Sequence, residues 1–281
     1  MDVLKKQTIQ VPVDSRETFQ PLGVHFMWLG QSGFLFSVNG MLVLVDAYLS
    51  NYLEHNHGNL PYAHDRMIPP PIADNLISDI DLIVVTHGHE DHLDPELMRR
   101  MSRSNTKAVF AVPPGCVGSL ETCGISSELI RSVSPEEPFT FNDSIRIESF
   151  PAAHPQPNFD TAKVWALSYR LFFADKTILF AGDTTIFRQW AVWAASKPCD
   201  LFVLPINGRD PVKEARGIVG NMDFQEAVII SQSLATPLLG THFGMFAFNT
   251  IDETAVHEEI DRFGLEQKVE LTRIGVIYSM I

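Results

Sequence analysis

Short apolar runs separated by turn residues organise the first part of the chain. Residues 24–28 and 34–37 are apolar runs on either side of a glycine-rich turn, and Asn39-Gly40 leads into a third run at 41–45. Asn-Gly between two apolar runs is a strong signal for a two-residue hairpin. The pattern therefore predicts an antiparallel β-meander near the start of the chain.

The later part of the chain predicts two more hairpins and then alternating strands and helices. Asn142-Asp143 and Ala174-Asp175 each lie between two apolar runs, as expected of hairpin turns. A chain that combines meanders with helices in this way belongs to the α+β class. We expect a buried strand at 81–86, a helix that begins after Asp94-Pro95, further helices at 185–195, 223–234 and 252–263, and strands at 201–205, 236–240 and 269–277.

A dense group of metal-binding residue types follows the buried strand. Residues 86–94 read Thr-His-Gly-His-Glu-Asp-His-Leu-Asp, and imidazole nitrogens and carboxylate oxygens are usual ligands of zinc, manganese and iron. A turn that leaves a strand can direct His87 and His89 to one ion and Asp91 and His92 to its neighbour. The alternative is a polar loop that is merely rich in histidine. This order, directly after a buried strand, favours metal binding.

The order of these residues resembles the HxHxDH motif of the metallo-β-lactamase superfamily. The resemblance implies further ligands at later strand ends, and the matching positions are His154, Asp183 and His242. Each follows a short apolar stretch, although each taken singly has an ordinary explanation as a turn former or a surface residue. The resemblance also implies a four-layer αββα sandwich, here a single domain over residues 1–281, with the site along one edge between the two halves.

The resemblance further implies a centre that binds two divalent metal ions, manganese or zinc, with iron as another possibility. A hydroxide held between the ions would attack an ester-like carbonyl, so Asp91, as a proton shuttle, and Asp183, as a bridge, are the candidate catalytic residues. The expected ligands are His87, His89 and His154 for one ion, Asp91, His92 and His242 for the other, and Asp183 for both.

Two segments are similar to the L-ascorbate-6-phosphate lactonase-like branch of the superfamily. The first is residues 66–72, reading Arg-Met-Ile-Pro-Pro-Pro-Ile, and the second is the glycine-rich, arginine-containing loop at 205–223. Arginine presents forked donors that suit phosphate or carboxylate, and the alternative is a surface loop whose arginines offset local acid. The candidate substrate-binding residues in this loop are Asn207, Arg209, Arg216 and Asn221.

Residues 52–80 form a long connection between strands, and a loop of this length without regular structure of its own is typical of a lid over a functional site. The segment contains His55, His57 and His64. A second metal site there is disfavoured, because no carboxylate or cysteine stands at matching spacing, and the roles of these histidines stay open.

Charge and composition narrow the classes of function. The net charge of −13 disfavours a nucleic-acid substrate, and the three cysteines form neither a disulfide framework nor a thiolate zinc site. The sequence contains no apolar stretch of membrane-spanning length and no apolar core of a secretion signal near its start, so we expect a cytoplasmic protein without membrane contact. Trp190 and Trp193 lie on a predicted helix, where they favour a core role, although self-association into a homo-oligomer stays possible.

The leading hypothesis is a metal-dependent hydrolase that attacks a lactone or ester of a small anionic substrate, such as a phosphorylated sugar acid, with a metal-bound hydroxide. One alternative is a phosphodiesterase or ribonuclease of the same superfamily, against which the net charge argues. The other alternative is a non-hydrolytic di-metal protein, such as a di-iron relative.

Overall fold

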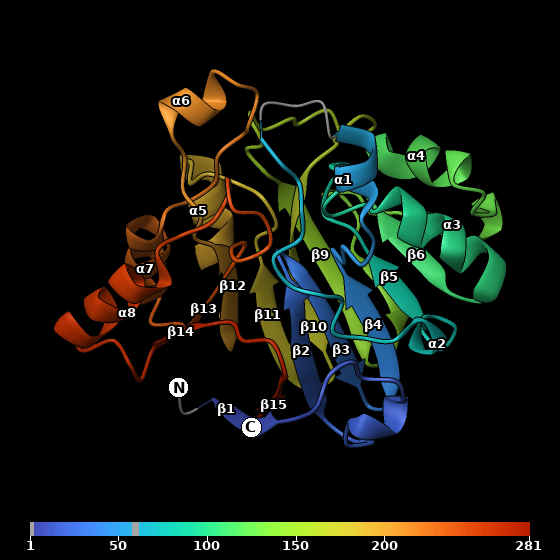
Figure 1. Ribbon diagram of the computed structural model, residues 1–281, viewed down its shortest axis with the longest axis horizontal. Coiled ribbons are helices and arrows are strands. Elements are labelled where there is room, and N and C mark those ends of the chain that lie inside the picture. The colour runs from blue at the N-terminus through green and yellow to red at the C-terminus, as the bar shows by residue number, and fades with distance from the viewer. Residues whose placement is uncertain (1–2, 58–61) are drawn as a thin grey trace.

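The apolar runs form two β-sheets that pack face to face in a computed structural model, which describes residues 3–57 and 62–281 (Figure 1). The 8-stranded sheet has the order β1 (Leu4–Thr8), β15 (Val276–Met280), β2 (Val24–Gly30), β3 (Gly33–Val38), β4 (Met41–Val45), β5 (Leu82–Val84), β6 (Val109–Val112) and β7 (Ile130–Ser132). The 7-stranded sheet has the order β14 (Val269–Leu271), β13 (Leu238–Thr241), β12 (Leu201–Pro205), β11 (Lys176–Phe180), β10 (Leu167–Phe173), β9 (Ile145–Pro151) and β8 (Phe139–Asn142).

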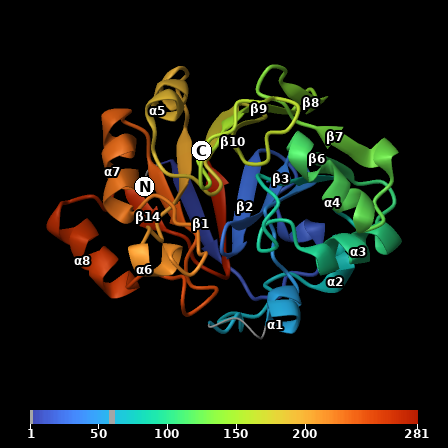
Figure 2. The same ribbon diagram turned by 90° about the horizontal axis from the view of Figure 1, so that it is seen from above.

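Helices lie on the outer sides of both sheets. Seen from above, α3 (Pro95–Ser104) and α4 (Val117–Thr122) flank one side, and α7 (Phe224–Ser233) and α8 (Glu253–Arg262) flank the other (Figure 2). This arrangement confirms the predicted four-layer αββα sandwich. The remaining helices are α1 (Tyr52–His57), α2 (Asp74–Ile77), α5 (Arg188–Ala195) and α6 (Pro211–Glu214), with single 3-10 turns at Arg16–Thr18, Pro114–Cys116 and Ser127–Leu129.

Aromatic side chains fill the space between the two sheets. Phe34 and Phe36 on β3 contact Phe180 and Phe173 of the opposite sheet, with ring centroids 5.7 and 5.2 Å apart. Leu35, between them, points to the other face, where it packs into a second core with residues of α3. Because successive side chains of a strand point to opposite faces, a strand buried on both faces is mostly apolar, as β3 is apart from Ser37.

The predicted hairpins and most predicted elements match the structure. Asn39 and Gly40 form the β3–β4 turn with φ of 50° and 82°, the backbone conformation that Asn-Gly favours. Asp94 caps α3, because its carboxylate accepts hydrogen bonds from the backbone N–H groups of Glu96 and Leu97. Trp190 on α5 is fully buried and donates its indole N–H to the Ser168 hydroxyl, which confirms its expected core role.

Two expectations about regular structure were wrong. The run at 269–277 is not one strand, because Gly275, with φ of 73°, breaks it into β14 and β15, and β15 crosses to the 8-stranded sheet. The segment 52–80 is not a loop without regular structure, because it contains α1 and α2; its residues 58–61 lie outside the described part of the chain. Its predicted role as a lid stays a prediction.

Among the described residues, no helix is long and apolar enough to cross a membrane.

Candidate metal centre

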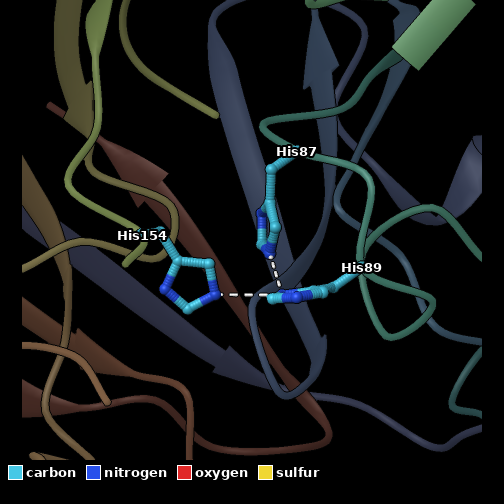
Figure 3. Close-up of side chains that lie close together, drawn as sticks. All are labelled: His87, His89 and His154. Carbon is cyan, nitrogen blue, oxygen red and sulfur yellow. Dashed lines mark hydrogen bonds between the residues drawn. The ribbon is translucent and has the colours of Figure 1, made fainter. Parts of the chain in front are cut away.

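Three histidines from two separate segments converge at one end of the sandwich. His87 and His89 lie in the turn that leaves β5, and His154 follows β9. The Nε2 atoms of His87 and His154 each lie 2.9 Å from Nδ1 of His89 (Figure 3). The turn is fixed to the second sheet, because the N–H of Leu167 donates to the carbonyl of Thr86. The structure thus brings together the three residues predicted to hold one ion.

A second group lies beside the first and consists of Asp91, His92 and His242. One side-chain nitrogen or oxygen from each of them lies within 4.8 Å of the others. His92 and His242 are buried, whereas the Asp91 side chain keeps 19% of its surface exposed. These are the three residues predicted to hold the other ion.

The carboxylate of Asp183 lies between the two groups. Its Oδ2 is 3.6 Å from Nε2 of His154 and 3.0 Å from Nε2 of His242, and its Oδ1 is 3.3 Å from Nε2 of His92. Gly182 makes this close approach possible, since a Cβ at this position would lie 2.8 Å from the Thr86 side chain and its φ is 59°. Asp183 therefore reaches residues of both groups, as a bridging ligand would.

The donor set fits divalent cations better than it fits a network of hydrogen bonds. His89 Nδ1 has two imidazole nitrogens at 2.9 Å, yet a neutral imidazole nitrogen either carries one proton or accepts one. Nε2 of His92 and Oδ1 of Asp183 are buried and lie 3.3 Å from each other, yet neither atom has a hydrogen-bond partner of good geometry among the described residues. Buried polar atoms that converge without partners are costly unless a cation satisfies them. Histidine nitrogens and carboxylate oxygens without thiolate suit zinc, manganese or iron.

Electrostatics keeps three of the predicted ligands in the forms that bind cations: His87, His154 and Asp183. Burial lowers the pKa of His154 to about 3, and burial together with the neighbouring imidazoles holds the pKa of His87 well below its ordinary value. Burial raises the pKa of Asp183, but His242 and His92 outweigh this effect and hold it well below the ordinary value. Near neutral pH, His87 and His154 therefore present lone pairs, and Asp183 presents a negative charge. His92 differs, because burial lowers its pKa but the carboxylates of Asp183, Asp91 and Asp46 outweigh burial and raise the pKa well above its ordinary value.

Asp46 is a site residue that the sequence analysis missed. Its Oδ2 lies 2.8 Å from Nδ1 of His92, and its Oδ1 accepts the backbone N–H of Thr86. A carboxylate that accepts the Nδ1 proton of an imidazole leaves Nε2 free to bind metal. The sequence did contain one indication of this role. Asp46 directly follows the apolar strand β4, which pairs in parallel with β5, the strand that precedes the histidine-rich turn.

Gln31, in the β2–β3 turn, is a second missed residue. Its side-chain Nε2 lies 2.9 Å from Oδ2 of Asp91 and 3.3 Å from Nε2 of His242, and its carbonyl accepts the backbone N–H of His242. Among the described residues, six that are not glycine have positive φ, and Gln31, Asp46 and His242 are three of them. Such strained backbone persists where surrounding contacts enforce it, which is typical of functional sites. No sequence pattern pointed to Gln31.

Five of the seven predicted metal ligands line a cavity of about 530 Å³. Its floor carries His89, Asp91, His154, Asp183 and His242. Its walls come from the segment that contains α1, from the loop after β13 and from the loop between β12 and α7, including the following residues: Leu53, Tyr62, His64, Arg216, Phe246 and Phe248.

The four predicted substrate-binding residues occupy different positions. Arg216 lines the cavity, but Arg209 lines a neighbouring one and forms a two-pronged ion pair with Glu226, at 2.6 and 2.7 Å. Asn207 and Asn221 are linked to each other by a side-chain hydrogen bond of 3.1 Å. Direct substrate contact by any of the four stays a prediction, and Arg216 is the one that the structure places in the wall of the cavity.

The three extra histidines do not form a further ligand group among the described residues. His55 is exposed on α1, and Nε2 of His57 lies against the carboxylate of Glu90. His64 lies in the cavity wall, against Phe246 and Phe248.

Comparison with known proteins agrees with this geometry. The family model described as a beta-lactamase superfamily domain matches residues 42–243, a span that contains all seven predicted ligands. With the fold and the His/Asp clusters, this match shows that the chain belongs to the metallo-β-lactamase superfamily of metal-dependent hydrolases.

Individual relatives are distant. A protein from Hyperthermus butylicus named UPF0173 metal-dependent hydrolase is 24% identical over 255 residues, covering 90% of this chain and 97% of that protein. A mitochondrial N-acyl-phosphatidylethanolamine-hydrolyzing phospholipase D from Saccharomyces cerevisiae is 30% identical over 234 residues, and the match spans 80% of this chain but only 48% of the yeast protein. Isothiocyanate hydrolase from Delia radicum gut bacteria has a similar fold, with a TM-score of 0.74 and 15% identity, covering 91% of this chain and 99% of that one.

Proposed function

We propose that the chain hydrolyses an ester or lactone bond of a small anionic substrate at this centre. The position of Asp183 between two groups of metal-binding residues is the observation that carries the proposal. A shared carboxylate holds two cations close together, and a pair of cations is suited to stabilise both the attacking and the leaving oxygen of a hydrolysis. The cavity above the centre admits a small molecule.

The residues of the centre would have two roles, cation binding and proton transfer. His87, His89 and His154 would hold one cation, and Asp91, His92 and His242 would hold the other. When bound, the cations would lower the pKa of a coordinated water and polarise the scissile carbonyl. The partly exposed carboxylate of Asp91 borders the cavity, where it can accept a proton from the attacking water and return it to the leaving oxygen.

The anionic character of the substrate is inferred from Arg216. It is the only arginine or lysine among the described residues of the cavity wall, and no described residue forms an ion pair with its guanidinium. A carboxylate or phosphate that enters the cavity would provide the missing partner. The net charge of −13 disfavours nucleic acid as the source of that anion.

We further propose manganese or zinc as the metal, with iron as another candidate, and a substrate like that of the L-ascorbate-6-phosphate lactonase branch. A cytoplasmic location and self-association into a homo-oligomer also stay proposals. The ligand set supports the choice of metals, because it contains no thiolate.

Phosphodiester hydrolysis is the second candidate. The observation that favours it is the 30% identity to the yeast phospholipase D, whose name describes a phosphodiester substrate. That relative is about twice as long as the matched region, so the match leaves about half of the yeast protein without a counterpart in the compared segment.

A panel of substrates tests the proposal. Lactones, carboxylic esters, phosphodiesters and β-lactams are offered to the protein loaded with manganese or with zinc, and Asp183→Asn serves as the inactive control. The proposal predicts turnover of lactones or esters that depends on metal and is lost in the control. Turnover of phosphodiesters alone would establish the second candidate instead.

A further inference from the structure

One wall of the cavity is built almost entirely from aromatic rings. We define the aromatic wall as Tyr62, His64, Phe246 and Phe248, all of which line the cavity that contains the metal-binding residues. Two segments far apart in the sequence supply it, the region after α1 and the loop after β13. The second of these segments begins directly after His242, so the wall and the centre share one loop.

The four rings contact one another without interruption. Phe248 lies 4.9 Å from Tyr62 and 4.9 Å from His64, measured between ring centroids. Phe246 lies 5.7 Å from His64 and is stacked on Phe248 at 5.8 Å with an angle of 18° between planes. These distances fall in the range of favourable aromatic pairs.

Buried residues behind the rings hold the wall in place. Phe246 is 2% exposed and packs against Tyr48, which is fully buried, with ring centroids 5.7 Å apart. Tyr48, Leu53, Met245 and Phe246 form a separate apolar cluster against which Phe248 packs. A wall supported in this way needs little reordering when a ligand binds, which lowers the entropic cost of binding.

The wall offers few partners to a substrate rich in hydroxyl groups. The hydroxyl of Tyr62 already donates to the carbonyl of Arg216, and Ile218 and Val219 add further apolar surface to the cavity. Within the wall, the imidazole of His64 is the remaining polar group, so a polyhydroxylated acid placed against the wall would regain few of the hydrogen bonds that it loses to water. A flat apolar group would instead replace water at the ring faces, which is favourable.

We propose that the substrate carries an aryl group that packs against the aromatic wall while its ester-like carbonyl lies over the metal-binding residues. This inference rests on the proposed function, an ester or lactone hydrolase of a small anionic substrate. Within that function it favours an aryl-substituted acid or lactone over a sugar acid as the substrate class. Arg216, also in the cavity wall, would receive the anionic group of the substrate or of the acid product.

A matched pair of acids tests the wall without any catalysis. Phenylacetate and cyclohexylacetate carry the same charge and the same number of carbon atoms, but only the first contains a flat ring. Their binding to the metal-loaded full chain is measured by calorimetry. The wall predicts that phenylacetate binds about five-fold more tightly, since aromatic pairing adds roughly a factor of two to ten to affinity. Cyclohexylacetate is the more hydrophobic of the two, so a cavity that selects ligands by hydrophobicity alone would bind it more tightly.

Variants show whether the preference arises at the wall. Phe248→Leu keeps apolar bulk but removes the ring that contacts the other three, so it should reduce the preference for phenylacetate. Phe263→Ala removes an aromatic ring that is 62% exposed on the surface and does not line this cavity, so it should leave the preference unchanged. Equal binding of the two acids by the parent chain, or an unchanged preference in Phe248→Leu, would overturn the proposal.

A kinetic comparison separates this proposal from the proposed function. Isochroman-3-one is a δ-lactone fused to a benzene ring, and δ-valerolactone has the same lactone ring alone. Each kcat/KM is divided by the hydroxide-catalysed rate constant of the same lactone. Hydrolysis of both lactones with equal normalised kcat/KM would contradict the proposed aryl substrate but support ester or lactone hydrolysis. Preferential binding of phenylacetate, without hydrolysis of either lactone or of phenylacetate esters, would support the aryl-binding role of the wall but contradict ester or lactone hydrolysis.

Discussion

The carboxylate of Asp46 lies 2.8 Å from Nδ1 of His92, and both side chains are completely buried. His92 also faces Asp183 at 3.3 Å through its other ring nitrogen. One carboxylate thus sets the orientation of the imidazole, and the opposite nitrogen points into the centre. Asp46 is a positioning residue, because it acts through His92 and does not line the cavity.

Replacing Asp46 with Asn should weaken metal binding at the group that contains His92. Loss of an outer carboxylate that orients a histidine ligand costs about 10- to 100-fold in metal affinity. Calorimetric titration of the metal-free protein measures the effect, and Asp143→Asn, in the exposed β8–β9 turn, is the matched control. Identical metal affinities of Asp46→Asn and the parent would show that Asp46 does not position His92.

Gln31 should affect the same group of ligands by a different route. Its amide Nε2 lies near both Asp91 and His242, so Gln31→Ala removes a contact to each of them. We expect the variant to lose metal from the Asp91, His92 and His242 group first, which lowers the metal content of the purified protein towards one ion per chain. Elemental analysis provides the measurement. A variant that retains two ions per chain with parental affinity would contradict this role.

Arg209 and Arg216 should behave differently although the sequence places them in one loop. Arg216→Ala should raise KM for an anionic substrate about ten-fold with little change in KM for a neutral analogue, because it removes a charged contact in the cavity wall. Arg209→Ala should lower the free energy of unfolding by about 1 kcal/mol and leave KM unchanged, because its guanidinium is paired with Glu226. The opposite assignment of effects would place the substrate in the neighbouring cavity.

Sequence patterns predicted much of this fold because its strands are short, apolar and separated by clear turn signals. The Asn39-Gly40 hairpin is an example, since both residues adopt the backbone conformation that their types favour. The crossing of a strand from one sheet to the other was harder to predict from the sequence. The return of β15 to the 8-stranded sheet depends on pairing with β1 and β2, which are far away in the sequence and leave no local signal.

The residues of the candidate metal centre were likewise only partly predictable from the sequence. Ligands in a compact motif, such as His87 and His89, were visible from spacing alone. Gln31 was not, because its role comes from a turn whose carbonyl accepts the N–H of His242, 211 positions away along the chain. Arg209 and Arg216 were both predicted to bind substrate because they are the same residue type in one loop. The structure places only Arg216 in the wall of the cavity, whereas Arg209 pairs with Glu226.

Stability should depend on pH through Glu148. Burial raises its pKa, but hydrogen bonds from Lys197, Arg146 and Arg170 outweigh burial and lower the pKa to about 2. A carboxylate with a depressed pKa stabilises the fold above its ordinary pKa, and this contribution is lost as pH falls towards 2.

Glu148→Gln should therefore be less stable than the parent by about 2 kcal/mol at pH 7, and the difference should shrink between pH 4.5 and pH 2. Urea denaturation at several pH values measures it. Asp175→Asn, which removes a single exposed ion pair with Lys176, is the control and should show a much smaller difference. A constant difference across this pH range would mean that the charge of Glu148 does not contribute.

We propose that Asp183 joins two groups of ligands into one centre for two metals. The most direct test is the number of ions bound per chain, measured by elemental analysis alongside turnover, in the parent and in Asp183→Asn. We expect two ions per chain in the active parent, and in the variant at most one ion together with a loss of turnover of about 100-fold or more. Full turnover of the parent with a single ion, or two ions retained in an active Asp183→Asn variant, would contradict it.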